Sequence, residues 1–406
     1  MTATLTNRLF PALAEASLRR YLSGQIASVL GSWTQNVTLN LLVYHLSGSA
    51  AILALLNFLL YGPQLIVAPV AGSRIRSENA RRVTLCILMT SLVLTASLFV
   101  LSFAGMLGVK LILAHALAIG ISSAIEVPAR QVLLLSSLRD ASLTSNAVAM
   151  NTMVYNVGRM VGPTIAGFVY PAFGERMSFA IYMAALGFMA ACVRSIRLSS
   201  DVPAKQASGL RDAVDYVMAD AFSARYLPIL ACIGLFAGSY QTLVPLLADR
   251  AYHDAAYFTG LFFACAGAGS LSAAVLLSSA LGPRASARFI AWSPWTAVAA
   301  LLVLAVITNA VASGPAFYAL GFSLTFAATS TNATIQRRCP EHVRGGLVGM
   351  YGMAYNGTMP FGYLLVGTAS EALGVRNTFC AMAAVLGVGV LSITLLQTFR
   401  KQRPGA

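Results

Sequence analysis

Charged residues are scarce in this chain, and their scarcity excludes most soluble folds. Only 10% of the 406 residues are charged, whereas 58% are hydrophobic and the mean hydropathy is +0.75. A water-soluble domain has too little interior to bury so much apolar surface, so the solvent of this chain is expected to be a lipid bilayer. Acids are the rarest charged type, with 13 of them against 27 lysines and arginines.

Several signatures of chemistry are also absent from the sequence. No GxxxxGK[ST] loop is present, so ATP is not expected to be the direct energy source. The six cysteines are scattered, with no CxxC and no Cys/His cluster, so neither a metal site nor a disulfide framework is expected. A membrane enzyme would need clustered nucleophiles or ligands. We therefore expect no enzyme activity and no cofactor.

What the sequence does contain is a series of apolar segments, each long enough to cross about 30 Å of hydrocarbon. A flexible polar stretch and an amphipathic helix form the one long connection, 196–224, between two sets of six. The apolar face of that helix is expected to consist of Leu210, Val214, Val217, Met218 and Phe222. The expected organisation is a six-helix bundle at 1–195, a cytoplasmic linker at 196–224 and a second bundle at 225–406. The segments lie near 20–46, 51–73, 83–104, 109–135, 143–170, 178–195, 225–249, 255–281, 289–308, 314–336, 344–369 and 376–398.

The chain repeats itself, because residues 148–174 align with residues 348–374 without a gap. Identical pairs include Tyr155/Tyr355 and Asn156/Asn356, and they sit within a shared glycine spacing. A repeat of about half the chain predicts two bundles related by pseudo-two-fold symmetry, which rock about a central binding site. The expected fold class is therefore an all-α membrane protein of 12 transmembrane helices.

Basic residues follow the alternation of the loops rather than forming a nucleic-acid site. If the N-terminus is cytoplasmic, most of the 27 lysines and arginines fall on the cytoplasmic side. Both termini are then expected to be cytoplasmic. The short loops and the lack of a targeting signal indicate a multi-pass protein of the bacterial cytoplasmic membrane, expected to be a monomer.

Polar residues recur at helical spacing inside three segments. Unpaired amides are costly in hydrocarbon, so these faces must meet other helices or water. Interhelical hydrogen bonding would explain them, but three separate stripes favour a shared, partly hydrated substrate cavity, to which we also assign Tyr155 and Tyr355. The stripes are Gln25, Ser28, Ser32, Asn36 and Asn40; Asn57, Tyr61 and Gln64; and Thr325, Thr329, Asn332 and Gln336.

Glu126 is the only acid well inside a predicted segment. An ionised carboxylate is costly there, so this side chain is a candidate for proton coupling. A structural ion pair with Arg130 or Arg159 is the alternative explanation. His115, three helical turns earlier, is either a second relay station or a core histidine. Arg159, the only basic residue near mid-membrane, could hold an anionic substrate, respond to Glu126 or brace a helix contact.

The fifth segment carries closely spaced small residues and a proline. Glycines four residues apart let helix backbones approach closely, and proline bends a helix. We expect a tight seam that pivots where the two bundles meet. The residues of this motif are Gly158, Gly162, Pro163, Ala166 and Gly167.

These residues resemble the antiporter motif of major facilitator superfamily exporters. The run Glu126-x-Pro128-Ala129-Arg130, followed by Asn156-x-x-Arg159, is similar to a drug-efflux branch that includes macrolide and enterobactin-type siderophore exporters. The resemblance extends over the whole chain. It implies a cytoplasmic gate next to the loop between segments two and three. Arginine stands where that family usually has aspartate, so the gate must be built differently or be weaker. The gate residues would be Gly72, Arg76, Arg81, Arg82 and Arg130.

The resemblance and the residues together predict a secondary exporter that works by alternating access. Protons would move inward through Glu126 while a small amphiphilic drug, siderophore or other metabolite moves outward. Two alternatives stay open: an importer or uniporter of a small metabolite on the same fold, and a non-transporting membrane sensor. The expected partners are the small-molecule substrate, protons and the lipid bilayer.

Overall fold

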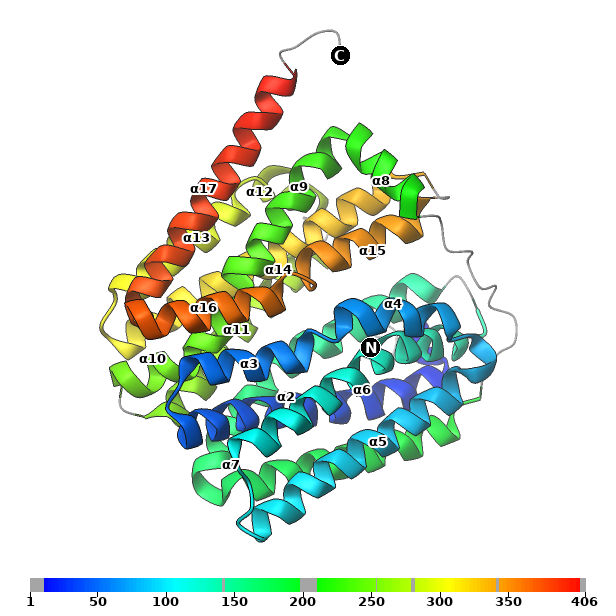
Figure 1. Ribbon diagram of the computed structural model, residues 1–406. Helices are drawn as coiled ribbons and strands as arrows, with labels where there is room; N and C mark the ends of the chain where they lie inside the picture. Colours follow the sequence, from blue (N-terminus) through cyan, green and yellow to red (C-terminus); the bar gives the residue numbers. More distant parts are fainter. Residues whose placement is uncertain are drawn as a thin grey trace, which may run out of the picture. The chain divides into compact units, whose positions relative to one another are not determined.

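The computed structural model describes residues 11–140, 143–197, 210–252, 254–278, 282–340 and 343–401. Within these ranges the chain is helical and contains no strand, as Figure 1 shows. By packing, the chain divides into two compact units. Unit 1 comprises Met1–Gly48 and Leu59–Lys205, and unit 2 comprises Ser49–Phe58 and Gln206–Ala406.

Every predicted apolar segment corresponds to helix in the described part of the chain. Eight helical stretches there are both long and apolar enough to span a membrane. One of them, Asn146–Ser195, holds the two predicted segments 143–170 and 178–195. The first, ninth and eleventh segments are not among these long apolar helices. The first carries the polar stripe, which lowers its hydropathy, and the ninth has only 14 helical residues. The eleventh is divided into two shorter helices near Asn356.

Unit 1 is a helical bundle in which the longest helix, α7, contacts both α2 and α5. Its core residues, among them Leu18, Tyr21, Leu88 and Met189, are fully or almost fully buried. Lipid is as apolar as these side chains, so close packing rather than exclusion from water holds the bundle together. The elements are η1 (Pro11–Ala14), α2 (Ala16–Ser47), α3 (Ala50–Tyr61, shared with unit 2), α4 (Gln64–Arg74), α5 (Ser77–Phe103), α6 (Val109–Ser136) and α7 (Thr144–Ser195).

Unit 2 has the same kind of helices but more interruptions. Its strongest packing is between α11 and α14, and α13 contacts both α14 and α17. The elements are α8 (Leu210–Ala219), α9 (Ala221–Cys232), η3 (Ile233–Ala237), η4 (Gly238–Thr242), α10 (Leu243–Tyr252), α11 (Ala255–Ser278), α12 (Gly282–Phe289), α13 (Ser293–Val306), α14 (Ala310–Arg338), α15 (Arg344–Tyr355), α16 (Met359–Leu373) and α17 (Val375–Lys401).

The interruptions of segments seven and eleven lie against each other. A Cβ on Gly234 would come within 2.3 Å of the carbonyl oxygen of Tyr355, so the backbones touch where both helices deviate from α geometry. The hydroxyl of Thr358 lies 3.1 Å from the carbonyl oxygen of Ala231. A side chain from one interruption thus helps to satisfy the backbone of the other, as hydrocarbon requires.

The backbone reproduces the sequence repeat at two glycine pairs. Gly174 and Gly374 have φ angles of 74° and 78°, the left-handed region that favours glycine, and each separates the two segments that flank it. Gly162 lies against Leu30 and Trp33 of the first segment, and Gly362 lies against Leu235 and Ser239 of the seventh. The repeated glycines therefore occupy equivalent structural positions.

The linker helix packs through a different face from the one predicted. Residues 198–209, the expected flexible stretch, lie outside the described residues. In α8, Ala213 and Val217 are buried against Ile335, whereas Val214 and Met218 are exposed. The apolar stripe assigned from the sequence thus needs correction, because the small side chain of Ala213 allows the closer contact.

The start of α3 is held by an acid from α16 within unit 2. The carboxylate of Glu371 accepts hydrogen bonds from the Ser49 hydroxyl and from the backbone N–H of Ala51, the latter at 3.0 Å. Gly367, one turn earlier, has no room for a side chain, since its Cβ would lie 2.2 Å from that of Ala54. The Ser49 bond, followed by the Ala51 bond, lowers the pKa of the exposed Glu371 carboxyl below its ordinary value.

Glu371→Gln is therefore expected to lower the thermal stability of the chain at about pH 7. A charge at a helix N-terminus contributes about 0.3–1 kcal/mol. Since the pKa of Glu371 is depressed on folding, its stabilisation is present at neutral pH and is lost as the pH falls through the folded-state value. Melting curves of both proteins should converge below about pH 4.5, and a gap independent of pH would contradict this assignment.

A polar cavity as the candidate functional site

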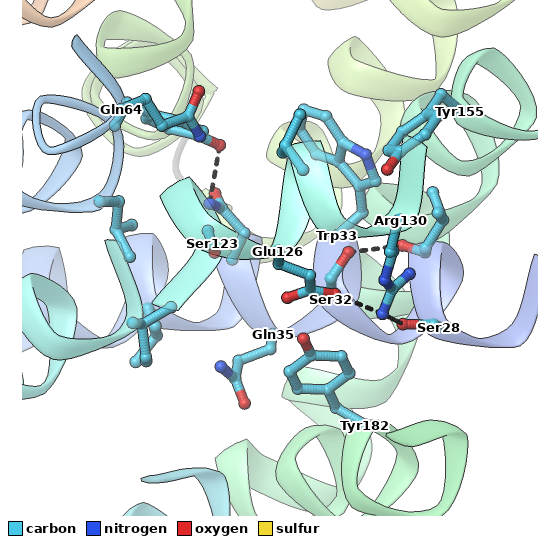
Figure 2. Close-up of a pocket in the computed structure, with 17 residues that line it drawn as sticks. Ser28, Ser32, Trp33, Gln35, Gln64, Ser123, Glu126, Arg130, Tyr155 and Tyr182 are labelled. Atoms are coloured by element: carbon cyan, nitrogen blue, oxygen red, sulfur yellow. Dashed lines mark hydrogen bonds and ion pairs between the residues drawn. The ribbon is translucent and has the colours of Figure 1, made fainter. Parts of the chain in front are cut away.

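A polar cavity of about 200 Å³ lies in unit 1, among α2, α4, α6 and α7 and the last turn of α3. It is smaller than the pockets of roughly 300–1,000 Å³ that enclose drug-sized ligands. In this conformation it has room for a polar group and some water. Figure 2 shows the residues that line it. Its lining includes Ser28, Ser32, Trp33, Gln35, Asn36, Tyr61, Gln64, Ser123, Glu126, Arg130, Tyr155 and Tyr182.

The centre of the cavity is an ion pair between Glu126 and Arg130, one helical turn apart on α6. The Glu126 side chain is 13% exposed and that of Arg130 is 5% exposed. Figure 2 shows the carboxylate and the guanidinium beside Ser28 and Ser32. Of the two partners that the sequence offered for Glu126, the structure selects Arg130. The carboxylate nonetheless lines the cavity, so water reaches it.

Arg130 is held by three residues of α2, in addition to Glu126 of its own helix. It donates to the Gln25 side-chain oxygen at 2.7 Å and to the Ser28 hydroxyl at 2.8 Å, and the Tyr21 hydroxyl lies 3.3 Å from its carbonyl oxygen. A buried charge is tolerated when its partner and its hydrogen bonds are in place. Because α6 continues to Ser136, this side chain lies inside the bundle, and its assignment to the cytoplasmic gate stays a prediction.

The predicted stripe on α2 is divided between the cavity and its wall. Ser28, Ser32 and Asn36 line the cavity, whereas Gln25 is buried behind it on Arg130. Asn36 donates to the Tyr61 hydroxyl at 2.9 Å, and Asn40 donates to Asn36. Some residues of the stripe therefore face the cavity and others bond to neighbouring groups, while the binding of substrate by the stripe stays a prediction.

The other predicted cavity residues lie in unit 2. Asn57 is buried and donates to the carbonyl of Leu53, while Gln336 donates to Asn332 at 2.8 Å on the same face of α14. These bonds satisfy donors of the Asn57 and Gln336 side-chain amides. The structure does not bring these unit 2 residues into the described cavity. Thr325 and Tyr355 are buried, and Thr329 is exposed.

His115 lies apart from the cavity lining. Its Nε2 is 2.7 Å from the Ser97 hydroxyl and its Nδ1 is 2.9 Å from the Leu111 carbonyl oxygen. Both ring nitrogens therefore have partners on α5 and α6. This arrangement is typical of a structural histidine, and no described contact links it to Glu126.

Arg159 stacks on a cavity residue. Its guanidinium carbon lies 5.6 Å from the centroid of the Trp33 ring, and its charge also acts on the Tyr61 hydroxyl. Trp33 and Tyr61 both line the cavity. No aspartate or glutamate that the structure describes comes within 4.0 Å of Arg159. The alternative pairing of Arg159 with Glu126 is thus absent from this arrangement.

The loop between α4 and α5 makes local bonds near the predicted gate. The backbone N–H of Arg76 donates to Asn79 at 2.8 Å, and Arg81 donates to the Arg194 carbonyl. Gly72 approaches Pro128 of α6, and Arg82 is exposed. These contacts anchor the loop within unit 1, and its role as a gate stays a prediction.

Four polar or aromatic lining residues were not anticipated from the sequence. Trp33 and Gln35 flank the predicted stripe on α2, and Ser123 lies one turn before Glu126. Tyr182 comes from the second half of α7 and is 8% exposed. The helical spacing of Ser123 and Glu126 could have indicated Ser123. No sequence signal indicated Tyr182, because tertiary packing alone brings it to the site.

The glycines of the antiporter motif form a seam between α7 and α2, both in unit 1. A Cβ on Gly158 would lie 2.2 Å from a methyl carbon of Val29, and one on Gly162 would lie 2.4 Å from the Cβ of Trp33. Gly167 is buried, and Pro163 lies within α7. Gly158 and Gly162 thus pack α7 against α2 within unit 1, and a pivot where the bundles meet stays a prediction.

Gly162→Ala is expected to destabilise the protein and to disturb the cavity, because the added methyl group displaces Trp33. Overpacking of this kind costs about 1–3 kcal/mol. Gly187→Ala on the same helix is the matched control, since a Cβ there meets nothing within 4 Å. Thermal unfolding should separate the two variants, and equal melting temperatures would contradict the seam.

A second, apolar cavity of about 370 Å³ lies in unit 1 along α2 and α7, beside η1. Ile26 and Leu30 of α2 line it, and these residues flank Ser28 of the polar cavity. The helix α2 thus contributes to a polar and an apolar hollow. The other lining residues are Leu13, Leu22, Met150, Met153, Val154, Val157 and Gly158.

Comparison with known proteins assigns the chain that carries this site to a family. A family model described as transmembrane secretion effector matches residues 9–403. The chain is 24% identical over 386 residues to the staphyloferrin A transporter of Staphylococcus aureus (strain NCTC 8325 / PS 47), which covers 93% of this chain and 95% of the relative. It is 26% identical over 352 residues to the multidrug efflux pump Tap of Mycolicibacterium fortuitum, with coverage of 82% and 84%.

Solved transporter structures share the arrangement of helices. The nucleoside transporter NupG superposes with a TM-score of 0.74 at 10% identity, covering 94% of this chain and 98% of that one. A POT family transporter gives a TM-score of 0.68 at 10% identity, with coverage of 94% and 96%. At such identities the likeness concerns the fold alone. The chain is thus a multi-pass membrane protein with a transporter fold.

Proposed function

We propose that this chain, which belongs to the transmembrane secretion effector family and has the major facilitator fold, exports small amphiphilic molecules in exchange for protons. Transport itself follows from the family and the fold. Outward direction, proton coupling and the type of cargo are the parts that we propose. The cavity around Glu126 would be the site where cargo and proton act on each other.

The observation that carries the proposal is the environment of Glu126. Its carboxylate lines a cavity, yet it is largely withdrawn from water and paired with a single arginine. When Glu126 is ionised, the pair is neutral. When Glu126 is protonated, the positive charge of Arg130 is left unmatched. Protonation therefore changes the charge of the cavity by one unit, so cargo that responds to this charge binds the two protonation states with different affinities, which any coupling to protons requires.

The two hollows beside α2 support an amphiphilic cargo. Ser28 and Ser32 offer hydroxyl groups on the polar side, whereas Ile26 and Leu30 border the apolar one. A molecule with a polar head and an apolar body could use both. The staphyloferrin A transporter and the efflux pump Tap support two cargo types, a siderophore or related secreted metabolite and a drug.

The proposed location is the bacterial cytoplasmic membrane, with both termini on the cytoplasmic side and a single chain as the working unit. The excess of basic residues on one set of loops supports this orientation. Reaction of a reporter cysteine placed at either terminus with an impermeant thiol reagent would test it. Labelling in intact cells would contradict the proposed orientation.

A cargo screen in a strain without its own efflux pumps tests the function directly. Cells that express the chain should accumulate less of the cargo than control cells, and collapse of the proton gradient should abolish the difference. Expression that raises accumulation would indicate import. Efflux that persists unchanged after collapse of the gradient would rule out proton antiport.

A further inference from the structure

We infer that the cavity takes a cargo bearing a carboxylate-type anion, and that Arg159 together with Trp33 forms the subsite for that anion. The inference rests on the proposed transport function and names the class of its cargo. It starts from the charges at the site. Glu126 and Arg130 cancel each other, whereas Arg159 adds a positive charge that no described carboxylate balances within 4.0 Å.

The geometry leaves the donors of Arg159 free. Its guanidinium carbon lies over the Trp33 ring, 5.6 Å from the centroid, and the side chain makes no hydrogen bond with any residue that the structure describes. The N–H groups of a guanidinium without such bonds match a carboxylate in a two-pronged bond. The indole N–H of Trp33 is a further donor without a hydrogen-bond partner in the described residues.

The second copy of the repeat indicates that the fold does not need the charge of Arg159. The residue 200 positions later, within the aligned stretch, is Met359. The end of its side chain lies against Gly238. Because unit 2 packs an uncharged side chain at the matching position, a structural brace is a weaker explanation for Arg159 than a ligand contact.

Three dansyl probes of similar size would test the inference: dansylglycine is an anion, dansylamide is neutral and dansylcadaverine is a cation. The full chain would be reconstituted in nanodiscs, with empty nanodiscs as the background. Trp33 is the only tryptophan outside unit 2. Energy transfer from tryptophan to a bound probe therefore reports binding, and Trp33→Phe should abolish most of the signal from this site.

The wild-type chain should bind dansylglycine about 10- to 100-fold more tightly than dansylamide, the usual effect of a hydrogen bond to a charged group. Arg159→Gln should reduce this ratio to about 1 without weakening dansylamide binding, and Arg159→Lys should keep part of it. Lys110→Gln removes one positive charge at an exposed position of α6 and is the matched control, which should bind as the wild type does.

Equal or tighter binding of dansylamide or dansylcadaverine by the wild type would overturn the inference. So would an equal loss of preference in Lys110→Gln and Arg159→Gln, which would indicate a long-range effect of net charge. Failure of the transport proposal would look different. A chain that prefers dansylglycine but moves no cargo contradicts transport alone, whereas a proton-driven exporter without that preference contradicts the anion subsite alone.

Discussion

Glu126→Gln is expected to abolish proton-driven efflux while leaving the protein folded. Glutamine has nearly the same volume as glutamate and keeps an oxygen that can accept from Arg130, so the packing around α6 should persist. It cannot gain or lose a proton, so the charge of the cavity no longer changes. Cells with the variant should accumulate cargo to the level seen in wild-type cells after collapse of the proton gradient.

Glu175→Gln is the matched control for this experiment. Glu175 lies on α7 outside the cavity lining and accepts a hydrogen bond from Ser102. The substitution removes the same charge, yet efflux should remain close to the wild-type rate. Equal loss of efflux in both variants would show that net charge or folding, rather than the cavity carboxylate, limits transport.

Arg130→Met is expected to have the largest effect on stability. It leaves the Glu126 carboxylate without a cation and removes the donors that Gln25 and Ser28 accept from. Breaking a buried pair from one side costs about 3–5 kcal/mol, because a charge remains without compensation. The purified variant should therefore melt well below the wild type.

The double variant Glu126→Gln/Arg130→Met should recover much of that loss, since no uncompensated charge is left. A double-mutant cycle on thermal unfolding measures the coupling between the two residues. If the double variant is no more stable than Arg130→Met, the main role of Arg130 is its contact with Gln25 and Ser28. The assignment of the ion pair as the centre of the site would then be wrong.

Much of the fold follows from local patterns in the sequence. Apolar length predicted the spans, and the spacing of repeated residues predicted the duplicated architecture, which the positive φ angles of Gly174 and Gly374 reflect. Helix interruptions were harder to predict. The deviation at 233–242 has no proline within it, and it depends on the close approach of Gly234 to the Tyr355 carbonyl.

The site was only partly accessible from the sequence. Spacing placed Ser28, Ser32 and Asn36 on one face of α2, and rarity singled out Glu126. A stripe does not show which neighbour each of its residues meets. Asn57 belongs to the same predicted stripe as Tyr61 and was therefore assigned to the cavity, and in the structure its amide donates to the Leu53 carbonyl. Tyr182 enters the cavity from a helix far along the chain, which no local pattern reports.

The duplicated fold carries its charged site in one copy. In unit 1, α6 supplies Glu126 and Arg130, whereas the matching helix of unit 2, α14, has no acidic residue and carries basic residues only in its last turn, at Arg337 and Arg338. The repeated glycines are shared by both copies, because they serve helix packing. Residues common to both units therefore maintain the architecture, and those present in one are the candidates for function.

The central claim is that Glu126 couples the transport of cargo to the transport of protons. The most direct test is to measure the proton movement that cargo causes. Everted membrane vesicles would be acidified inside by respiration and followed with the pH-sensitive dye acridine orange. Addition of cargo should release protons from vesicles that contain the wild-type chain and restore the dye fluorescence, while vesicles with Glu126→Gln should give no response. An equal response from the Glu126→Gln vesicles would contradict the account.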